Sequence, residues 1–326
     1  MTPRCTLALA GDTMLGRGVA EELPRTGPKP LFDSGVRAAV ADADAFVLNL
    51  ECCVSARGEP IPIPGKPFHF RAPPVAAEAL ADLGVRAVTL ANNHALDYGP
   101  EALLDTLSHL ADAGIETVGA GADLDQARAP VLLSAGGLRI GLLGVTDHPP
   151  EYAAGPGKPG VAFADLGQGV PDWLTEQIRD LREHTDIVLV TVHWGPNIVG
   201  EPVDHVRRAA PALLDAGATL IAGHSAHVFH GYTRHVLYDL GDFIDDYAIH
   251  PALRNDRSLL WLVALDENGP RRTEAVPLSL DYCRTRLTDP DTPDWDWTAR
   301  RLIDVCARLG TDVEQRDGRV ATDWTR

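Results

Sequence analysis

The chain has 326 residues, of which 45% are hydrophobic and 23% charged, as is typical of a globular protein with one large or two ordinary domains. Lys and Arg number 29 against 46 Asp and Glu, which gives a formal net charge of −17. Such a surface repels nucleic acid and anionic membranes, so we expect neither as a partner. The charge also disfavours a long polyanionic substrate, unless a local basic surface overrides the overall field.

The cysteines and the N-terminus predict a cytoplasmic protein. The five cysteines are scattered and show no C-x-x-C spacing, which is typical of buried thiols in a reducing compartment. The apolar run that follows Met1–Arg4 is interrupted at Gly11, so it is too short for the core of a signal peptide. No apolar run approaches the length of a membrane span, and we expect no membrane insertion.

Up to about residue 250, short apolar runs alternate with helical patterns, which predicts an α/β core. In the first half, strands are predicted at 6–10, 46–50 and 85–90, helices at 38–45, 76–83 and 101–113, and loops at 23–35 and 55–74. The second loop cannot be helical, because proline and glycine recur throughout it. A loop of this length inside a compact chain is usually functional or mobile.

The second half continues the alternation and then changes character. Short β segments are predicted at 116–118, 131–134, 138–145, 187–192, 218–222 and 236–240, with helices at 173–183 and 206–216. The runs 259–265 and 274–280 flank a turn sequence and predict a hairpin, and a helix follows at 299–309. We therefore predict an α/β domain over residues 1–258 and a hairpin plus helix over 259–326 that complete or pack on it.

Polar residues able to bind a metal directly follow five of the apolar β runs. They are Asp12, Glu51, Asn93 with His94, His193, and His224 with His227. Because open α/β sheets place their ligands at the carboxyl ends of the strands, these side chains should gather at one rim. Each residue alone has an ordinary structural explanation, such as a helix cap or a turn. The repetition at five strand ends favours a site.

These residue types suit a divalent metal. Imidazole and carboxylate ligands fit Zn, Mn or Fe, and a carboxylate can bridge two ions. Two such ions generate hydroxide at neutral pH and hold the attacked group. A histidine outside the metal shell would then act as general acid to the leaving group, and His94 suits this role because Asp97 is close enough in sequence to orient it.

The loops after the first two predicted ligands carry cationic groups that are candidates for binding the phosphate or carboxylate of a substrate. These groups are Arg17, Lys66, His69 and Arg71. The alternative is that they are ordinary loop charges, since only their position and charge single them out.

Six motifs occur in order between residue 6 and about residue 245. They are Gly11-Asp12-x-Met14-Leu15-Gly16, Asn49-Leu50-Glu51, Ala91-Asn92-Asn93-His94-x-x-Asp97-Tyr98-Gly99, His193-Trp194-Gly195, Gly223-His224-x-x-His227-Val228 and Leu240-Gly241-Asp242-Phe243. As a set they resemble the CapA family of capsule and poly-γ-glutamate synthesis, which is built on the calcineurin-like metallophosphoesterase fold. The resemblance implies a four-layer α/β/β/α sandwich with the site at the strand ends.

The resemblance also implies roles for the residues. Asp12 and His227 would hold one metal, and Glu51 would bridge it to a second. Asn93, His193 and His224 would hold the second metal, and His94 would be the general acid. A metal-bound hydroxide would attack a phosphoester or a glutamyl amide. The alternative is a non-catalytic factor for polymer handling or assembly that retains the metal site.

Two departures bear on the number of ions, one from the metallophosphoesterase pattern and one from the CapA pattern. Metallophosphoesterases have a histidine where this chain has Met14, and a thioether is a poor ligand for a hard ion. The family more often has Asn where this chain has Asp242, and that carboxylate could restore an anionic ligand. One ion and two ions both remain open from the sequence.

Overall fold

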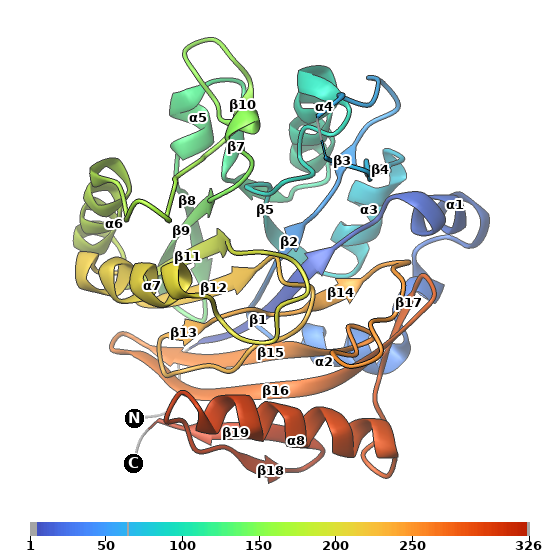
Figure 1. Ribbon diagram of the computed structural model, residues 1–326, viewed down its shortest axis with the longest axis vertical. Helices are drawn as coiled ribbons and strands as arrows, with labels where there is room; N and C mark the ends of the chain where they lie inside the picture. The colour runs from blue at the N-terminus through green and yellow to red at the C-terminus, as the bar shows by residue number, and fades with distance from the viewer. Residues whose placement is uncertain (1–4, 64, 325–326) are drawn as a thin grey trace.

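Two β-sheets pack face to face in the computed structural model, which describes residues 5–63 and 65–324 (Figure 1). Leu7 and Leu9 of the larger sheet meet Leu142 and Leu189 of the smaller one in a shared core. Helices cover the outer face of each sheet, so the predicted four-layer α/β/β/α arrangement is confirmed. Met1–Arg4, on which the signal-peptide prediction depends, lie outside the described residues.

The larger sheet is mixed. Its order is β18 (Glu314–Arg316), β19 (Arg319–Asp323), β16 (Gly269–Asp281), β15 (Arg257–Asp266), β1 (Cys5–Thr13), β2 (Ala45–Leu50), β5 (Val85–Thr89) and β6 (Glu116–Val118), with β14 (Asp242–Ile244) beside β1 and β17 (Arg284–Leu287) beside β16. Strands β1, β2, β5, β6 and β14 pair in parallel. The hairpin β15–β16 is antiparallel and joins the sheet at β1.

The smaller sheet is parallel apart from one edge strand. Its order is β13 (Val236–Leu237), β12 (Leu220–His224), β11 (Ile187–His193), β9 (Leu138–Thr146) and β8 (Val131–Ala135). Only β8 is antiparallel among these strands. Strands β9 and β11 are buried almost throughout, because helices cover one face and the larger sheet covers the other. Two small sheets, β3–β4 (Cys53–Val54 and Arg71–Ala72) and β7–β10 (Ala120–Gly121 and Gly160–Val161), lie apart from these layers.

The helices divide between the two outer faces. The larger sheet is covered by α1 (Arg17–Thr26), α2 (Ser34–Ala41), α3 (Val75–Asp82) and α4 (Gly99–Asp112), and the smaller by α6 (Asp172–His184) and α7 (Asp204–Ala216). Helix α8 (Pro293–Ala307) packs on β15, β16 and β19. The short helices are α5 (Leu124–Arg128), η1 (Lys29–Leu31) and η2 (Pro150–Tyr152).

The structure departs from the predicted elements near the N-terminus and at α8, which begins at Pro293 rather than at residue 299. The predicted loop at 23–35 is wrong at both ends, because α1 continues through Pro24 to Thr26 and α2 already begins at Ser34. Burial of Val19 and Leu23 outweighs the proline, and the Asp33 side chain caps α2 by accepting from the Val36 amide at 2.7 Å. The predicted helix at 38–45 therefore lies four residues too late.

The C-terminal segment is continuous with the core. Leu7 of β1 pairs with Val263 of β15, so the hairpin extends the larger sheet. Helix α8 buries Trp295 and Leu302 against it. The domain division at residue 258 stays a prediction. All five cysteines are buried and free, and no helix among the described residues is both long and apolar enough to cross a membrane.

Candidate metal centre

Strands from both sheets end at the same place, where the arrowheads of β1, β11 and β12 approach one another (Figure 1). Asp12 of β1 is in register with Asn49 of β2 and with Asp242 of β14, and His193 of β11 is in register with His224 of β12. All five side chains are essentially inaccessible to solvent. The apolar strands thus deliver a buried polar cluster at their carboxyl ends.

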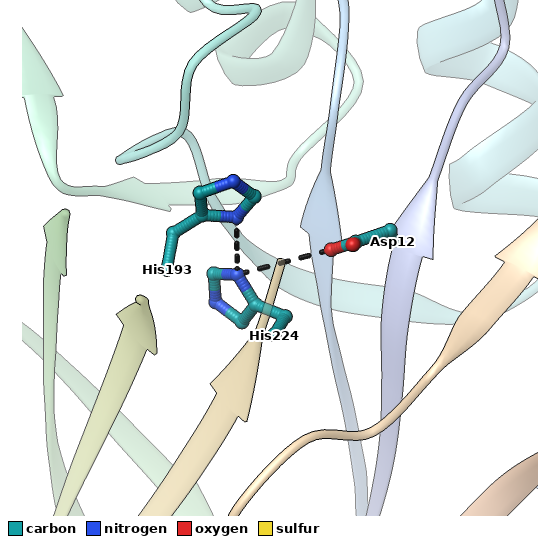
Figure 2. A group of neighbouring side chains, drawn as sticks. All are labelled: Asp12, His193 and His224. Atoms are coloured by element: carbon teal, nitrogen blue, oxygen red, sulfur yellow. Dashed lines mark hydrogen bonds and ion pairs between the residues drawn. The ribbon is translucent and has the colours of Figure 1, made fainter. Parts of the chain in front are cut away.

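Asp12, His193 and His224 form the first group, which we call the histidine group (Figure 2). One potential ligand atom from each lies within 4.8 Å of the others. The Nδ1 atoms of the two histidines are 2.8 Å apart, and His224 Nδ1 is 3.8 Å from Asp12 Oδ1. The Nε2 atoms of both rings are buried and have no hydrogen-bond partner among the described residues.

Asp12, His227 and Asp242 form the second group, which we call the carboxylate group. Their ligand atoms also lie within 4.8 Å of one another. His227 Nδ1 is 2.8 Å from Asp242 Oδ1 and 3.2 Å from Asp12 Oδ2. His227 adopts φ 58° and Ser225 φ 116°, a left-handed bend that is rare outside glycine and that turns the loop after β12 back toward Asp12.

Glu51 lies between the two groups. One carboxylate oxygen is 3.9 Å from His193 Nε2 and the other is 3.9 Å from His227 Nδ1. Both oxygens are buried and have no hydrogen-bond partner among the residues that the structure describes. Asp12 is common to both groups, so two carboxylates are placed where a bridging ligand would be needed; the bridging role of Glu51 stays a prediction.

The electrostatics of the two groups differ. Burial lowers the pKa of His193 well below its ordinary value and that of His224 to about 4. For His227, burial alone would lower the pKa, but the charges of Asp242 and Glu51 outweigh it and raise the pKa well above its ordinary value.

The carboxyl groups respond to the same neighbourhood. Burial, reinforced by the charge of Asp12, raises the pKa of Glu51 well above its ordinary value. Burial also raises the pKa of Asp242, although His227 opposes it. For Asp12, burial alone would raise the pKa, but the hydrogen bond and the charge of His227 outweigh burial and lower it. Three carboxyl groups that are buried this close together repel one another when ionised, and a bound cation would relieve that repulsion.

The residues present fit a divalent metal. Buried polar atoms normally find hydrogen-bond partners, yet several in this cluster have none among the described residues. They are Glu51 Oε1 and Oε2, Asn93 Oδ1, His193 Nε2, His224 Nε2 and Asp242 Oδ2. A set of imidazole nitrogens and carboxylate or amide oxygens is the donor chemistry that Zn, Mn and Fe take in proteins.

His94, the predicted general acid, is held beside the cluster by Asp97. His94 Nδ1 lies 2.5 Å from Asp97 Oδ2, whose carboxylate also accepts from the Phe70 amide at 2.6 Å and from the Tyr152 hydroxyl at 3.0 Å. The Phe70 ring stacks on the imidazole at 4.0 Å between centroids. Burial lowers the pKa of His94 to about 4, against the opposing charge of Asp97. The bond through Nδ1 leaves Nε2 as the free ring nitrogen.

The four predicted substrate cations are placed very differently. Lys66 joins the network of His94: its Nζ donates to the Asn93 carbonyl at 2.7 Å and lies 3.1 Å from Asp97 Oδ1. Arg17 pairs with Asp246 at 3.3 Å. The other two contact backbone carbonyls of loops. His69 Nε2 lies 2.7 Å from the Ile61 carbonyl oxygen. The Arg71 guanidinium donates to the carbonyls of Arg57 at 3.1 Å and Gly58 at 3.0 Å.

Sequence reasoning missed a second histidine cluster beside the first. Asp147 follows β9 and accepts from the imidazoles of His148 and of His205, the latter at 2.8 Å, and from the Gly195 amide at 3.1 Å. The ring of His148 is 5.1 Å from that of His193. Asn93, Asp147, His148 and His205 line a cavity of about 460 Å³. The signal was available, because Asp147 and His148 come almost directly after the predicted strand at 138–145.

Met14 occupies the position at which the resemblance to metallophosphoesterases implies a histidine. Its side chain is fully buried in the core beneath the helices of the larger sheet, and its sulfur accepts a hydrogen bond from the Gly16 amide at 3.0 Å. Asp242, across from Asp12 on β14, is the residue that completes the carboxylate group instead.

Comparisons with known proteins agree with these motifs. The chain is 31% identical to a probable polyglutamine synthesis accessory protein of Mycobacterium tuberculosis, over 95% of this chain and 93% of that protein. It is 31% identical to the PGA biosynthesis protein CapA of Bacillus subtilis, covering 84% and 71%, and 29% identical to the capsule biosynthesis protein CapA of Bacillus anthracis, covering 85% and 68%. The family model described as bacterial capsule synthesis protein PGA_cap matches residues 6–247, and the chain belongs to that family.

Proposed function

We propose that this protein is a metal-dependent hydrolase of capsule-polymer metabolism that cleaves a phosphoester or a glutamyl amide. The observation that carries the proposal is the pair of buried ligand groups that share Asp12 and contain nitrogen and oxygen atoms without hydrogen-bond partners among the described residues. The names of the relatives support the biological setting, since they refer to capsule, PGA and polyglutamine synthesis. A cytoplasmic location is part of the proposal and rests on the cysteines and composition.

The chain's own residues would position the reaction. Asn49 donates to Asp12 Oδ1 at 2.7 Å and the Ser225 amide donates to Oδ2 at 3.2 Å, so this carboxylate is fixed from both sides. One or two divalent ions held at the two groups would supply a water of lowered pKa and a positive charge for the attacked group. His94, oriented by Asp97, would serve the departing group through Nε2.

The test begins with the elemental content of the purified protein and continues with the metal-loaded protein against phosphoesters and γ-glutamyl peptides. We expect one or two equivalents of Zn, Mn or Fe, and turnover of one substrate class. His94→Gln should abolish that turnover with the metal content unchanged, because His94 belongs to neither ligand group. His184→Gln, on an exposed side chain of α6, is the matched control. Protein that binds no divalent metal would contradict the proposal.

The second candidate is a non-catalytic factor that handles the polymer and retains the metal site. Met14 favours it, because this position contributes a buried apolar side chain where catalytic metallophosphoesterases have a histidine ligand. A protein that binds metal tightly and turns over neither substrate class would support this candidate. Turnover that disappears in His94→Gln would exclude it.

A further inference from the structure

A cavity of about 750 Å³ lies between α8 and two loops, at a different place from the metal centre. Its wall includes Gly200 and Glu201 from one loop, Leu253 from the other, and Trp297 and Arg301 from α8. None of the proposed metal ligands lines it. The volume is within the range of small-molecule sites in proteins.

Arg301 forms no ion pair with any of the described residues, although the negative charge of Glu201 acts on it from a distance. Its guanidinium lies 5.2 Å from the ring centre of Phe229 and 5.7 Å from that of Trp297. The Nε and Nη2 atoms are buried and have no hydrogen-bond partner among the described residues. Burial lowers the pKa of this guanidinium. Guanidinium groups lose favourable hydration when they are buried, so this arrangement is costly unless an anion compensates for it.

Three nearby arginines are already paired with carboxylates. Arg308 pairs with Glu201, and Arg257 pairs with Asp294 at 2.6 Å. Arg254 binds Asp256 at 2.7 Å. Arg301 therefore differs from these three in forming no ion pair within the part of the chain that the structure describes. Arg300, which also lines the cavity, is exposed to solvent.

We propose that this cavity binds an organic carboxylate, which pairs with the Arg301 guanidinium and packs its apolar part against Trp297. A planar guanidinium matches a carboxylate geometrically. Leu253 and Val305 add apolar wall, whereas Glu201 and Asp304 place negative charge in the lining and disfavour a dianion such as phosphate. The ligand is a free organic acid or the carboxylate of an acidic peptide. The Arg301 guanidinium would attract either ligand at short range, although the net charge of −17 repels anions at long range.

The cavity lies beside chain segments that come from the metal centre. Gly200 belongs to the loop after β11, which ends at His193, and Leu253 belongs to the segment after β14, which begins at Asp242. Phe229 follows His227 by two residues. The binding proposal does not depend on hydrolase activity, because the ligand would contact Arg301 and α8 and none of the ligand groups.

Calorimetric titration of the full chain tests the proposal with four probes: hexanoate, its neutral analogue hexanamide, the peptide tetraglutamate, and inorganic phosphate. We expect hexanoate or tetraglutamate to bind at least about tenfold more tightly than hexanamide. Binding of hexanoate alone identifies a free acid as the ligand type, and tighter binding of tetraglutamate identifies an acidic peptide. Arg301→Met should weaken the carboxylate at least about tenfold, because it removes the charge and keeps an apolar side chain of similar length.

Two further variants distinguish the loss of the Arg301 charge from a general loss of structure. Glu201→Gln removes a negative charge from the lining and should tighten binding a few-fold, which is the opposite direction. Arg286→Met, on the exposed side chain of β17, changes the net charge equally and should leave binding unchanged. The proposal is overturned by carboxylate binding that survives Arg301→Met, by phosphate binding as well as hexanoate, or by no binding of either carboxylate up to about 10 mM.

Discussion

The histidine group and the carboxylate group share Asp12 and are otherwise opposite in character. His193 and His224 face each other across paired strands, and burial keeps the pKa of both rings low. His227 lies only three residues beyond His224, yet it is surrounded by carboxylates that raise its pKa. Two histidines only three residues apart, one at the end of β12 and one in the loop after it, therefore meet opposite electrostatic conditions, because each has a different set of tertiary neighbours.

This difference predicts two metal positions of unequal chemistry. The histidine group offers two neutral imidazoles and one carboxylate, which suits Zn. The carboxylate group offers two carboxylates and one imidazole, which shifts the preference toward Mn. The experiments below separate the two groups, in order of decreasing expected effect.

Asp12→Asn should have the largest effect, because Asp12 is the one residue common to both groups. The amide keeps the shape of the side chain and removes its charge, so we expect bound metal to fall below about a tenth of the wild-type content. Elemental analysis after gel filtration measures it. Asp180→Asn, on a side chain that is 77% exposed, is the control. Retention of one full equivalent of metal would show that the groups do not depend on a shared ligand.

His224→Ala and His227→Ala should each remove one ion and leave a different one behind. The ion left in His227→Ala would occupy the histidine group, and the ion left in His224→Ala would occupy the carboxylate group. We expect the preference for Zn over Mn to be at least about tenfold lower in His224→Ala than in His227→Ala. Competition dialysis against both metals measures this ratio, and equal ratios would contradict the distinction between the groups.

The metal-free protein should show the same opposition in its response to pH. The pKa of His224 is about 4 in the folded chain against about 6.5 when unfolded, so its contribution to stability is lost as pH falls from about 6.5 toward 4. The pKa of His227 is raised, so its contribution is present below about 6.5 and is lost as pH rises above that value.

Replacing each histidine by asparagine tests these two signs. His224→Asn should flatten the fall of the melting temperature on the acid side, and His227→Asn should flatten it on the alkaline side. Thermal unfolding in the presence of a chelator, from about pH 4.5 to 9, makes the measurement. If His224→Asn instead flattens the alkaline side and His227→Asn the acid side, the electrostatic distinction between the groups is wrong.

His148→Gln should have the smallest effect, because His148 lies beside His193 in the open cavity and belongs to neither ligand group. Loss of one hydrogen bond to a substrate is worth about 1 kcal/mol, so we expect KM to rise about fivefold with metal content unchanged. Steady-state kinetics on the substrate class that the panel identifies provide the value, with His184→Gln as control. A loss of metal in His148→Gln would assign this histidine to the centre itself.

The sequence alone could predict the strands and the residues at their ends. Apolar runs of β-rich composition stop abruptly at Asp12, Glu51, His193 and His224, and this local pattern does not depend on knowing how the sheets pack. The ordered motifs were specific enough to identify the family and the four-layer fold. Helix boundaries were less predictable: α1 passes through Pro24 because its apolar face is buried, which only tertiary packing reveals.

Only the tertiary structure decided how the residues are grouped. That Asp12 belongs to both groups follows from strands of two different sheets meeting at one edge, a contact that leaves no local signal in the chain. The opposite pKa shifts of His224 and His227 likewise depend on distant segments that exclude water and supply counter-charges. The same holds for the Arg301 guanidinium, whose Nε and Nη2 have no hydrogen-bond partner in the described part of the chain. The sequence was therefore enough to identify the candidate ligands, whereas tertiary packing decided which charges surround each of them.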